Sequence, residues 1–366
     1  MTNLNVRVEL TQNPKAKTPE DKLGFGTVFT DHLFLMDWDA EQGWHDARVV
    51  PYQNLQLDPS VGALHYGQAI FEGLKAYNNG GKVYLFRPEK NFERLNKSAD
   101  RLSLPQLDEK FALEALKLFV SVDRSWVPTT PGTSLYLRPL MFNSEVGLGV
   151  HPAKKVTYLV MASPVGAYFT AGLKPMRLFV EDEYVRAAVG GVGFAKTAGN
   201  YAASLKGQLK AEEFGCQQCL WLDAKEHRYV EEGGAMNVFF KINGEYYTPA
   251  LTGSILPGVT RDSMLQLLRD RGEKVHEARL DVNDLFAKAK TGELEEMFCT
   301  GTAAVVTPVG TLVRVVNHET GEKEEVAING GETGEATKSL YEELVNLQLG
   351  LGEDRHGWLV EVCDAE

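Results

Sequence analysis

The sequence predicts an α+β fold divided into two domains, and three observations predict it. The chain has 366 residues, more than one hydrophobic core usually organises. Its apolar runs have strand length and follow one another without regular helical crossovers, which favours a largely antiparallel sheet. A stretch rich in turn formers separates the two halves. We therefore expect an N-terminal domain over residues 1–163, an interdomain loop over 164–175 and a second domain over 176–366.

The elements of the first half follow from periodicity and turn signals. Pro88 opens a helix that places Phe92, Leu95, Ala99 and Leu102 on one face. A second helix is expected from residue 108 to about residue 126. Strands are expected at residues 28–37, 82–87, 134–141 and 156–162.

The second half alternates less regularly. A helix is expected from about residue 202 to 214, ended by Gly215, and another that opens over residues 256–262 and closes near Gly272. Strands are expected at residues 176–180, 218–223, 227–231, 236–242, 245–247 and 296–299.

Composition excludes several classes of function. The formal charge of -12 repels phosphate backbones and anionic membranes, so we expect neither nucleic acid nor a membrane as a partner. The longest apolar runs, such as residues 135–140 and 156–162, are far too short to span a bilayer. Residues 1–22 lack the apolar segment of a signal peptide, which makes the cytoplasm the expected location.

The chain has 4 cysteines, too few for a disulfide framework. Cys216 and Cys219 have CxxC spacing, which is compatible with a redox or zinc site. No second Cys/His pair lies close by in the sequence, and Cys219 begins an apolar run. We therefore expect buried structural thiols and no metal site.

Residues 190–201 place one lysine, Lys196, between glycine turns and ahead of a helix. A lysine in a pocket can lose its proton and form a Schiff base, whereas most lysines beside glycines are exposed loop residues. The same segment is also one letter from a P-loop, with Ala195 in place of glycine. The P-loop interpretation is weaker because the preceding residues 181–186 are charged and the fold nearby is expected to be antiparallel.

Two turns could bind an anion. Gly258, Val259 and Thr260 place backbone N–H groups and a hydroxyl at a helix start, where the helix dipole favours negative charge. Residues 301–304, Gly-Thr-Ala-Ala, follow a strand and add a second hydroxyl. Ordinary helix capping would explain the first turn equally well.

Glu231 and Glu232 end an apolar strand and precede two glycines. This carboxylate pair is either a solvated turn or the partner of a cofactor ring nitrogen that must stay protonated. Because neighbouring strand residues face opposite sides, only one of the two can serve such a nitrogen, and Glu232 is the candidate.

Taken together, these segments resemble the branched-chain aminotransferases of the fold-type IV class of pyridoxal-phosphate enzymes. The resemblance covers nearly the whole chain, and the order and spacing of its motifs carry it. The matching segments are residues 25–32, 65–76, 86–88, 91–95, 136–139, 190–201, 232–239, 256–261 and 301–303. It implies a small α/β domain with a mostly antiparallel sheet and a larger pseudobarrel-like domain.

The resemblance implies a lysine-bound pyridoxal 5'-phosphate. Lys196 would hold the cofactor and later move a proton between the substrate α-carbon and the cofactor C4′. Tyr201 matches the position that hydrogen-bonds the cofactor phenolate, and Glu232 the position that pairs with the pyridine nitrogen. The positions matching the phosphate site are Arg94, Val259, Thr260 and Thr302.

The resemblance further implies transamination between leucine, isoleucine or valine and 2-oxoglutarate, by a homodimer. Arg138 matches a position linked to glutamate, the second substrate. Ala303 and Ala304 would leave room and backbone donors for the α-carboxylate. The aromatic positions matching the family pocket are Phe25, Tyr66, Phe71, Tyr136 and Tyr168. Such an apolar wall favours branched aliphatic side chains.

Two positions depart from some relatives. Ala304 and Thr307 stand where those relatives carry a redox CxxC pair, so that thiol switch should be absent, and Ala235 replaces a hydroxyl residue. D-amino acid aminotransferase and aminodeoxychorismate lyase remain alternatives within the class, and a P-loop nucleotide hydrolase remains an alternative outside it. The sequence leaves open the preference among the three branched amino acids, the favoured direction, and the roles of Cys216 and Cys219.

Overall fold

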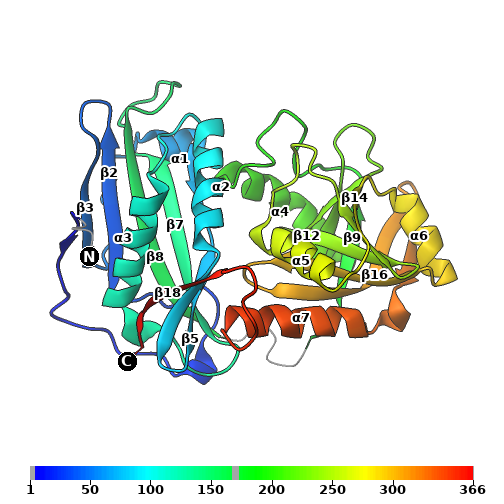
Figure 1. Ribbon diagram of the computed structural model, residues 1–366. Coiled ribbons are helices and arrows are strands. Elements are labelled where there is room, and N and C mark those ends of the chain that lie inside the picture. The colour runs from blue at the N-terminus through cyan, green and yellow to red at the C-terminus, as the bar shows by residue number, and fades with distance from the viewer. Residues whose placement is uncertain (1–4, 167–172, 366) are drawn as a thin grey trace. The chain divides into compact units, whose positions relative to one another are not determined.

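The computed structural model describes residues 5–166 and 173–365. The chain divides into two compact units (Figure 1). The first unit comprises residues 1–168, 195–198 and 346–366, and the second comprises 169–194 and 199–345. A four-residue segment that contains Lys196 therefore belongs to the first unit, although its flanks on both sides belong to the second.

The first unit is built on a nine-stranded sheet, counted over the described residues. Its strand order is β1-β3-β2-β8-β7-β5-β6-β18, with β4 paired to β7. Apart from the parallel pair of β1 with β3, every pairing is antiparallel, as expected. The strands are β1 Arg7–Val8, β2 His32–Asp39, β3 Gly43–Pro51, β4 Ala69–Phe71, β5 Leu74–Asn79, β6 Lys82–Phe86, β7 Ser134–Asn143, β8 Lys155–Val165 and β18 Leu359–Asp364.

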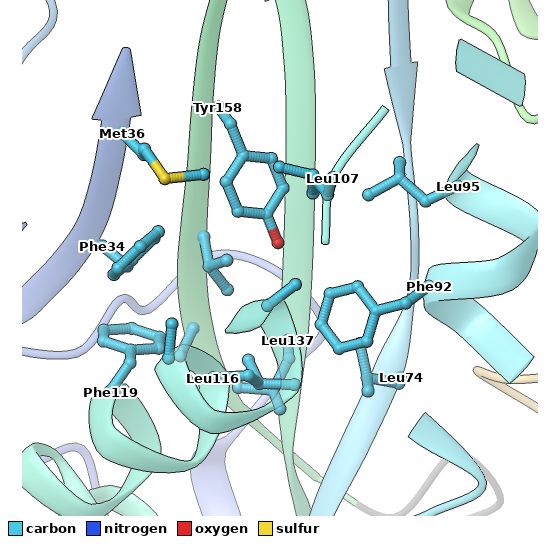
Figure 2. Packing of buried hydrophobic residues seen from close by; sticks show 14 of the residues in the cluster. Phe34, Met36, Leu74, Phe92, Leu95, Leu107, Leu116, Phe119, Leu137 and Tyr158 are labelled. Carbon is cyan, nitrogen blue, oxygen red and sulfur yellow. The ribbon is translucent and has the colours of Figure 1, made fainter. Parts of the chain in front are cut away.

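Two helices, α2 (Pro88–Arg101) and α3 (Glu109–Val122), bury their apolar faces in the core of this unit. Figure 2 shows Phe92 of α2 and Phe119 of α3 reaching toward strands that carry Leu137 and Tyr158. Asp108 caps α3 by accepting a 2.9 Å bond from the Phe111 N–H. The remaining helical segments of the unit are α1 Gly62–Tyr66 and the short 3₁₀ turns Glu20–Lys22 and Arg124–Trp126.

The C-terminal residues depart from the expected domain boundaries. We expected residues 176–366 to form one domain, but β18 pairs antiparallel with β6 and residues 346–366 belong to the first unit. The pairing satisfies the edge of β6, which would otherwise present unpaired backbone groups. At the other boundary, β8 continues to Val165, past the expected end at residue 163. Residues 167–172 of the expected interdomain loop lie outside the described residues.

The second unit holds another nine-stranded sheet, again counted over described residues. Its order is β11-β10-β9-β16-β15-β12-β13-β14, with β17 paired to β16. The strands are β9 Met176–Glu181, β10 Gln218–Leu222, β11 Val230–Gly233, β12 Asn237–Ile242, β13 Glu245–Pro249, β14 Val275–Ala278, β15 Leu294–Gly301, β16 Val305–Asn317 and β17 Glu322–Ala327. The helices are α4 Ala198–Glu213, α5 Val259–Asp270, α6 Val282–Thr291 and α7 Glu335–Gln348, with a 3₁₀ turn at Asn329–Gly331.

Both faces of this second sheet are covered. On β10, Leu220 and Leu222 join one apolar cluster, while Cys219 and Trp221 join another that includes Ala211 of α4. The alternation follows from the two-residue period of a strand. A strand that is buried on both faces has a continuous apolar sequence, and residues 219–222 form such a run.

One local expectation was wrong. The strand before the lysine segment, β9, pairs in parallel with β10 and with β16, where an antiparallel neighbourhood was expected. Helix α4 supplies the crossover between β9 and β10, and such a crossover is what a parallel pair requires. Sheet direction therefore gives no argument against a P-loop at Lys196.

Cys216, Cys219 and Cys299 are buried, Cys363 is partly exposed, and all four are free thiols. The burial of Cys216 and Cys219 agrees with the expectation from the sequence. Over the described residues, no helix combines the length and apolar character needed to cross a bilayer.

Candidate functional site

The predicted site residues fall in both units, and each set is described within its own unit. The first unit carries Arg94 and Lys196, together with the aromatic positions and Arg138. The second carries Tyr201, Glu232, Val259 and Thr260, together with the turn from Thr302 to Ala304. Tyr168 lies outside the described residues.

The Lys196 segment is fastened to the first unit by backbone hydrogen bonds. The Lys196 N–H donates to Ser98 Oγ over 2.9 Å, and its carbonyl accepts from the Phe71 N–H over 3.0 Å. Next to it, Thr197 Oγ1 donates to the Ala69 carbonyl over 2.8 Å. The Lys196 ammonium nitrogen lies 4.9 Å from the centre of the Phe71 ring, a cation–π distance. The backbone of residues 196–197 therefore lies beside β4 and is hydrogen-bonded to it.

Arg94, on α2, forms a buried ion pair with Glu72. Its Nε and Nη2 donate to the two carboxylate oxygens over 2.8 and 2.7 Å, a bidentate geometry. Asn91 Nδ2 adds a bond of 2.8 Å to the same carboxylate. The side chains of Arg94 and Glu72 are 7% and 1% exposed. Arg94 thus has a fixed orientation, which suits a residue that must present a planar fork to an anion.

Four of the predicted pocket residues do lie together. The Phe25 and Tyr136 rings meet edge to face with centres 4.9 Å apart. The Arg138 guanidinium lies 4.7 Å from the Phe71 ring centre and donates from Nη2 to Tyr136 Oη over 2.9 Å. Arg138 Nε is buried without a hydrogen-bond partner. An orphaned buried donor in an aromatic pocket is where an acidic ligand group would be stabilised.

Tyr66 is the predicted pocket residue that stands apart in the first unit. The residue is 45% exposed, and its hydroxyl donates to the Leu148 carbonyl. It ends the short helix α1, which Gly67 closes in the left-handed region.

In the second unit, Glu232 is buried at the end of β11. Its Oε1 lies 3.1 Å from Arg186 Nη2 and accepts the Leu256 N–H over 2.7 Å. Both side chains are under one-tenth exposed. Arg186 Nη2 also donates to the carbonyls of Gly193 and Ser254, so it joins three segments of this unit. Glu232 is therefore a fixed, buried carboxylate, as a partner for a protonated ring nitrogen must be.

Glu231 faces a different environment, as the strand alternation predicts. Its Oε1 accepts from Ser254 Oγ, while its Oε2 is buried without a partner. Burial raises the pKa of Glu231. The two neighbouring carboxylates thus differ in partner, because Glu232 has an arginine and Glu231 a hydroxyl.

The start of α5 has the geometry the sequence indicated. The helix begins at Val259, and Thr260 in its first turn is buried. Gly258 precedes it in extended conformation, and a Cβ there would lie 2.1 Å from Asn237 Oδ1. Asn237 in turn donates to the Leu256 carbonyl over 2.9 Å. Only glycine therefore fits at position 258 beside this asparagine.

Residues 302–304 form the turn between β15 and β16, and Gly301 pairs with Val305 across it. Val305 has φ of 59°, in the left-handed region that a β-branched residue rarely adopts. Such a conformation costs roughly 1 to 3 kcal/mol and is typical of functional turns. Just before the turn, Thr300 Oγ1 is buried without a partner. Burial, reinforced by the Glu232 charge, raises the pKa of Cys299 to about 12.

Tyr201 lies in the first turns of α4, whose start Asn200 fastens to the preceding loop by donating to the Val192 carbonyl over 2.9 Å. Among the described residues, no group of three or more His, Cys, Asp or Glu side chains is placed to hold a metal ion.

Sequence reasoning identified Arg94 but missed the polar residues beside it. Asn91, Arg94 and Ser98 form a buried polar stripe on α2, one position ahead of the apolar stripe of Phe92, Leu95 and Ala99. That offset is visible in the sequence and could have identified Asn91 and Ser98. Glu72 stands in an otherwise apolar segment, Ala69 to Leu74, and that setting could have marked it as buried. Arg186 gave no such signal, because a charged residue in a charged stretch normally indicates surface.

Each set has its own chemistry. The first unit provides an amine, which can react with a carbonyl carbon, and a fixed guanidinium, which can bind an anion. The second unit provides a helix N-terminus and hydroxyls, which can bind an anion, and a buried carboxylate, which can keep a ring nitrogen protonated.

A family model described as amino-transferase class IV matches residues 69–312. Among curated relatives, branched-chain-amino-acid aminotransferase 2 of Bacillus subtilis (strain 168) is 51% identical over 364 residues, which cover 99% of this chain and 98% of the relative.

Two solved structures are similar over most of their length. The Escherichia coli branched-chain amino acid aminotransferase has a TM-score of 0.74 at 29% identity, covering 91% of this chain and 99% of that chain. A T.th. branched-chain amino acid aminotransferase, complexed with N-(5'-phosphopyridoxyl)-L-glutamate, has a TM-score of 0.71 at 27% identity, covering 89% and 98%. This agreement confirms the fold class expected from the sequence.

Proposed function

The chain belongs to the class IV aminotransferases, within them to the branched-chain-amino-acid aminotransferases, and from this premise we propose the following reaction. The protein transfers the amino group between leucine, isoleucine or valine and 2-oxoglutarate, with pyridoxal 5'-phosphate bound to Lys196. The T.th. relative supports the cofactor, because the compound in its structure joins a phosphopyridoxyl group to glutamate.

The observation that carries the proposal is the fastening of Lys196. The backbone of Lys196 is bonded at both its N–H and its carbonyl, and the Phe71 ring lies under its ammonium group, so the amine is held in one place. A reactive amine needs such a fixed place, because its reach to the acceptor carbon must be reproduced at every turnover.

The residues of both units suit the cofactor. Arg94, the start of α5 with Thr260, and Thr302 are suited to bind the phosphate. Glu232, fixed by Arg186, is suited to keep the ring nitrogen protonated. When bound, pyridoxal 5'-phosphate supplies an electron sink that stabilises negative charge at the substrate α-carbon.

Within this scheme the incoming substrate amine would take the place of Lys196 Nζ on the cofactor, and the released Lys196 Nζ would accept the proton from the substrate α-carbon and later give it back. A neutral amine beside that bond serves as base and then as acid. Tyr201 would donate a hydrogen bond from its hydroxyl to the phenolate oxygen of the cofactor. The pocket residues orient the substrate and exclude water.

Arg138 is proposed to bind the side-chain carboxylate of glutamate. Its unpartnered Nε, over the Phe71 ring, supports this role. Arg138→Ala should lower kcat/KM for glutamate about a hundredfold, since a charged hydrogen-bond pair is lost, and leave kcat/KM for leucine nearly unchanged. An equal loss with both substrates would contradict the role.

We propose a homodimer in the cytoplasm. The support is an apolar surface on α1 and the segment that follows β7, which are joined by the Val61–Val146 bridge. Its exposed members are Leu64, Val146, Leu148 and Val150. Exposed apolar residues of neighbouring segments commonly form subunit interfaces. Light scattering on the purified protein tests this, with Leu148→Asp and Val150→Asp expected to shift the mass toward the monomer.

Two experiments test the reaction. Borohydride reduction of the yellow holoenzyme, followed by peptide mapping, should place the pyridoxyl label on Lys196 alone. Activity with L-leucine, D-alanine and aminodeoxychorismate, assayed side by side, should favour L-leucine. A label on another lysine would overturn the lysine assignment, and preference for either other substrate would overturn the substrate assignment.

A further inference from the structure

The first unit contributes the Arg94 guanidinium and the Lys196 amine to the proposed function. The polar stripe of α2 contains Arg94 and bonds to the backbone of Lys196. Arg94 and Asn91 bind the Glu72 carboxylate, and Ser98 Oγ accepts the Lys196 N–H. Arg94 and Ser98 are four residues apart, about one helical turn or 6 Å along the axis. Both residues are buried, and Ser98 is only 1% exposed.

The stripe is joined to the lysine by a second route. Phe71, whose N–H donates to the Lys196 carbonyl, is followed in the chain by Glu72. A closed path therefore runs from Ser98 to Lys196, on to Phe71 and Glu72, then to Arg94 and back along α2. A closed path of short bonds leaves each member little freedom to move alone.

We propose that Ser98 is a positioning residue for Lys196. Its hydroxyl fixes the backbone of the reactive lysine at a set distance from Arg94, because both are held by the same rigid helix. The inference rests on the proposed function in its account of what Lys196 does. The other links of the path are the ion pair of Glu72 with Arg94 and backbone bonds. The bond between Ser98 Oγ and the Lys196 N–H is therefore the link that a side-chain substitution can remove while the ion pair stays in place.

The structural part of this proposal is testable without cofactor. Hydrogen exchange of the Lys196 amide, resolved at single residues by fragmentation mass spectrometry of the apoenzyme, reports directly on the bond to Ser98. In Ser98→Ala we expect about tenfold faster exchange at Lys196, the loss typical of one hydrogen bond. Amides that donate within β7 and β8 should be unchanged.

Two variants serve as controls. Ser98→Thr keeps the hydroxyl and should restore slow exchange. Ser121→Ala removes another helical serine hydroxyl of the same unit, one that bonds only within its own helix, to the Lys117 carbonyl. It should leave Lys196 exchange unchanged. Unchanged exchange in Ser98→Ala, or exchange in Ser98→Thr as fast as in Ser98→Ala, overturns the proposal.

The functional part predicts a separation of kcat from KM. In Ser98→Ala, kcat with leucine should fall about tenfold to a hundredfold, because a small displacement of the amine slows proton transfer. KM should stay within about twofold, since the aromatic pocket keeps its contacts. An unchanged kcat with faster amide exchange overturns the functional part. Mapping of the pyridoxyl label in the unsubstituted protein decides separately whether Lys196 is the reactive lysine.

Discussion

The buried pair of Glu72 and Arg94 makes a quantitative prediction. In Glu72→Gln the shape is kept and the negative charge is lost, so the Arg94 guanidinium stays buried without its counter-ion. Removing one partner of a buried pair costs about 3 to 5 kcal/mol, because desolvation of the remaining charge is no longer compensated. Because both side chains are buried, this cost applies to the pair of Glu72 and Arg94.

The assay is thermal unfolding of the apoenzyme, so that no bound cofactor contributes to the melting temperature. For domains of about 150 to 250 residues, 1 kcal/mol shifts the melting temperature by roughly 2 to 4 °C. A loss of about 3 to 5 kcal/mol therefore predicts a fall of roughly 6 to 20 °C in the transition of the first unit.

Glu93, the residue before Arg94 in the sequence, provides a matched control. Glu93 lies on the exposed side of the same helix and pairs with Lys90 and Lys97. Exposed pairs of this kind contribute about 0.3 to 0.5 kcal/mol each, so the loss of both should cost at most about 1 kcal/mol, and Glu93→Gln should melt within about 4 °C of the unsubstituted protein.

A double variant tests the cause. Arg94→Met together with Glu72→Gln removes the buried charge along with its partner, and replacing a buried pair by apolar atoms is often close to neutral. The double variant should therefore melt above Glu72→Gln alone. If Glu72→Gln melts within about 2 °C of Glu93→Gln, or if the double variant melts below both single variants, the reasoning from buried charge is refuted.

Three further outcomes follow. Burial lowers the pKa of Lys75 from 10.5 to about 8, so the contribution of Lys75 to the free energy of unfolding should rise between pH 8 and 10.5, where only the unfolded chain holds this proton; the melting temperature of the unsubstituted protein should therefore rise relative to that of Lys75→Met across this range. A thiol-specific chromogenic reagent should label Cys363 in the native protein and the other three cysteines only after unfolding, because burial raises their pKa values; fast labelling of a second thiol would contradict this. Gly207→Ala should lower the free energy of unfolding by about 1 to 3 kcal/mol, because its Cβ would lie 2.5 Å from Trp221, whereas Gly199→Ala in the same helix meets nothing; denaturant titration compares the two.

Local patterns in the sequence predicted the elements that depend on neighbours along the chain. Pro88 and the spacing of Phe92, Leu95 and Ala99 predicted α2, which begins at Pro88 and buries that face. The turn residues before Val259 predicted the start of α5 within the expected segment. Both signals arise within one or two helical turns, where the chain's own geometry decides the outcome.

Pairing over long distances in the chain was not predictable in the same way. Nothing within residues 359–364 indicates that they pair with residues 82–86, because a strand's partner is chosen by the whole sheet. For the same reason, the expected second domain was drawn to include residues that belong to the first unit.

Residue type predicted part of the candidate site. Lys196 and Glu232 drew attention because their residue types are unusual between glycines or at the end of an apolar strand. Their partners Ser98 and Arg186 did not, since a buried polar residue is recognisable only when its bonding partner is known. Whether Lys196, Arg94, Tyr201 and Glu232 serve one cofactor stays a prediction for the label and activity experiments.

The position of β18 has a consequence for how the chain folds as it is made. Proteins are synthesised from the N-terminus, and domains usually fold as soon as they have emerged from the ribosome. The first unit cannot follow that rule, because its strand Leu359–Asp364 and the residues 195–198 are synthesised during and after the second unit. Until then β6 remains an unprotected edge open to pairing with other chains. Chaperone dependence and losses from interrupted translation should therefore concentrate in the half of the protein that is made first.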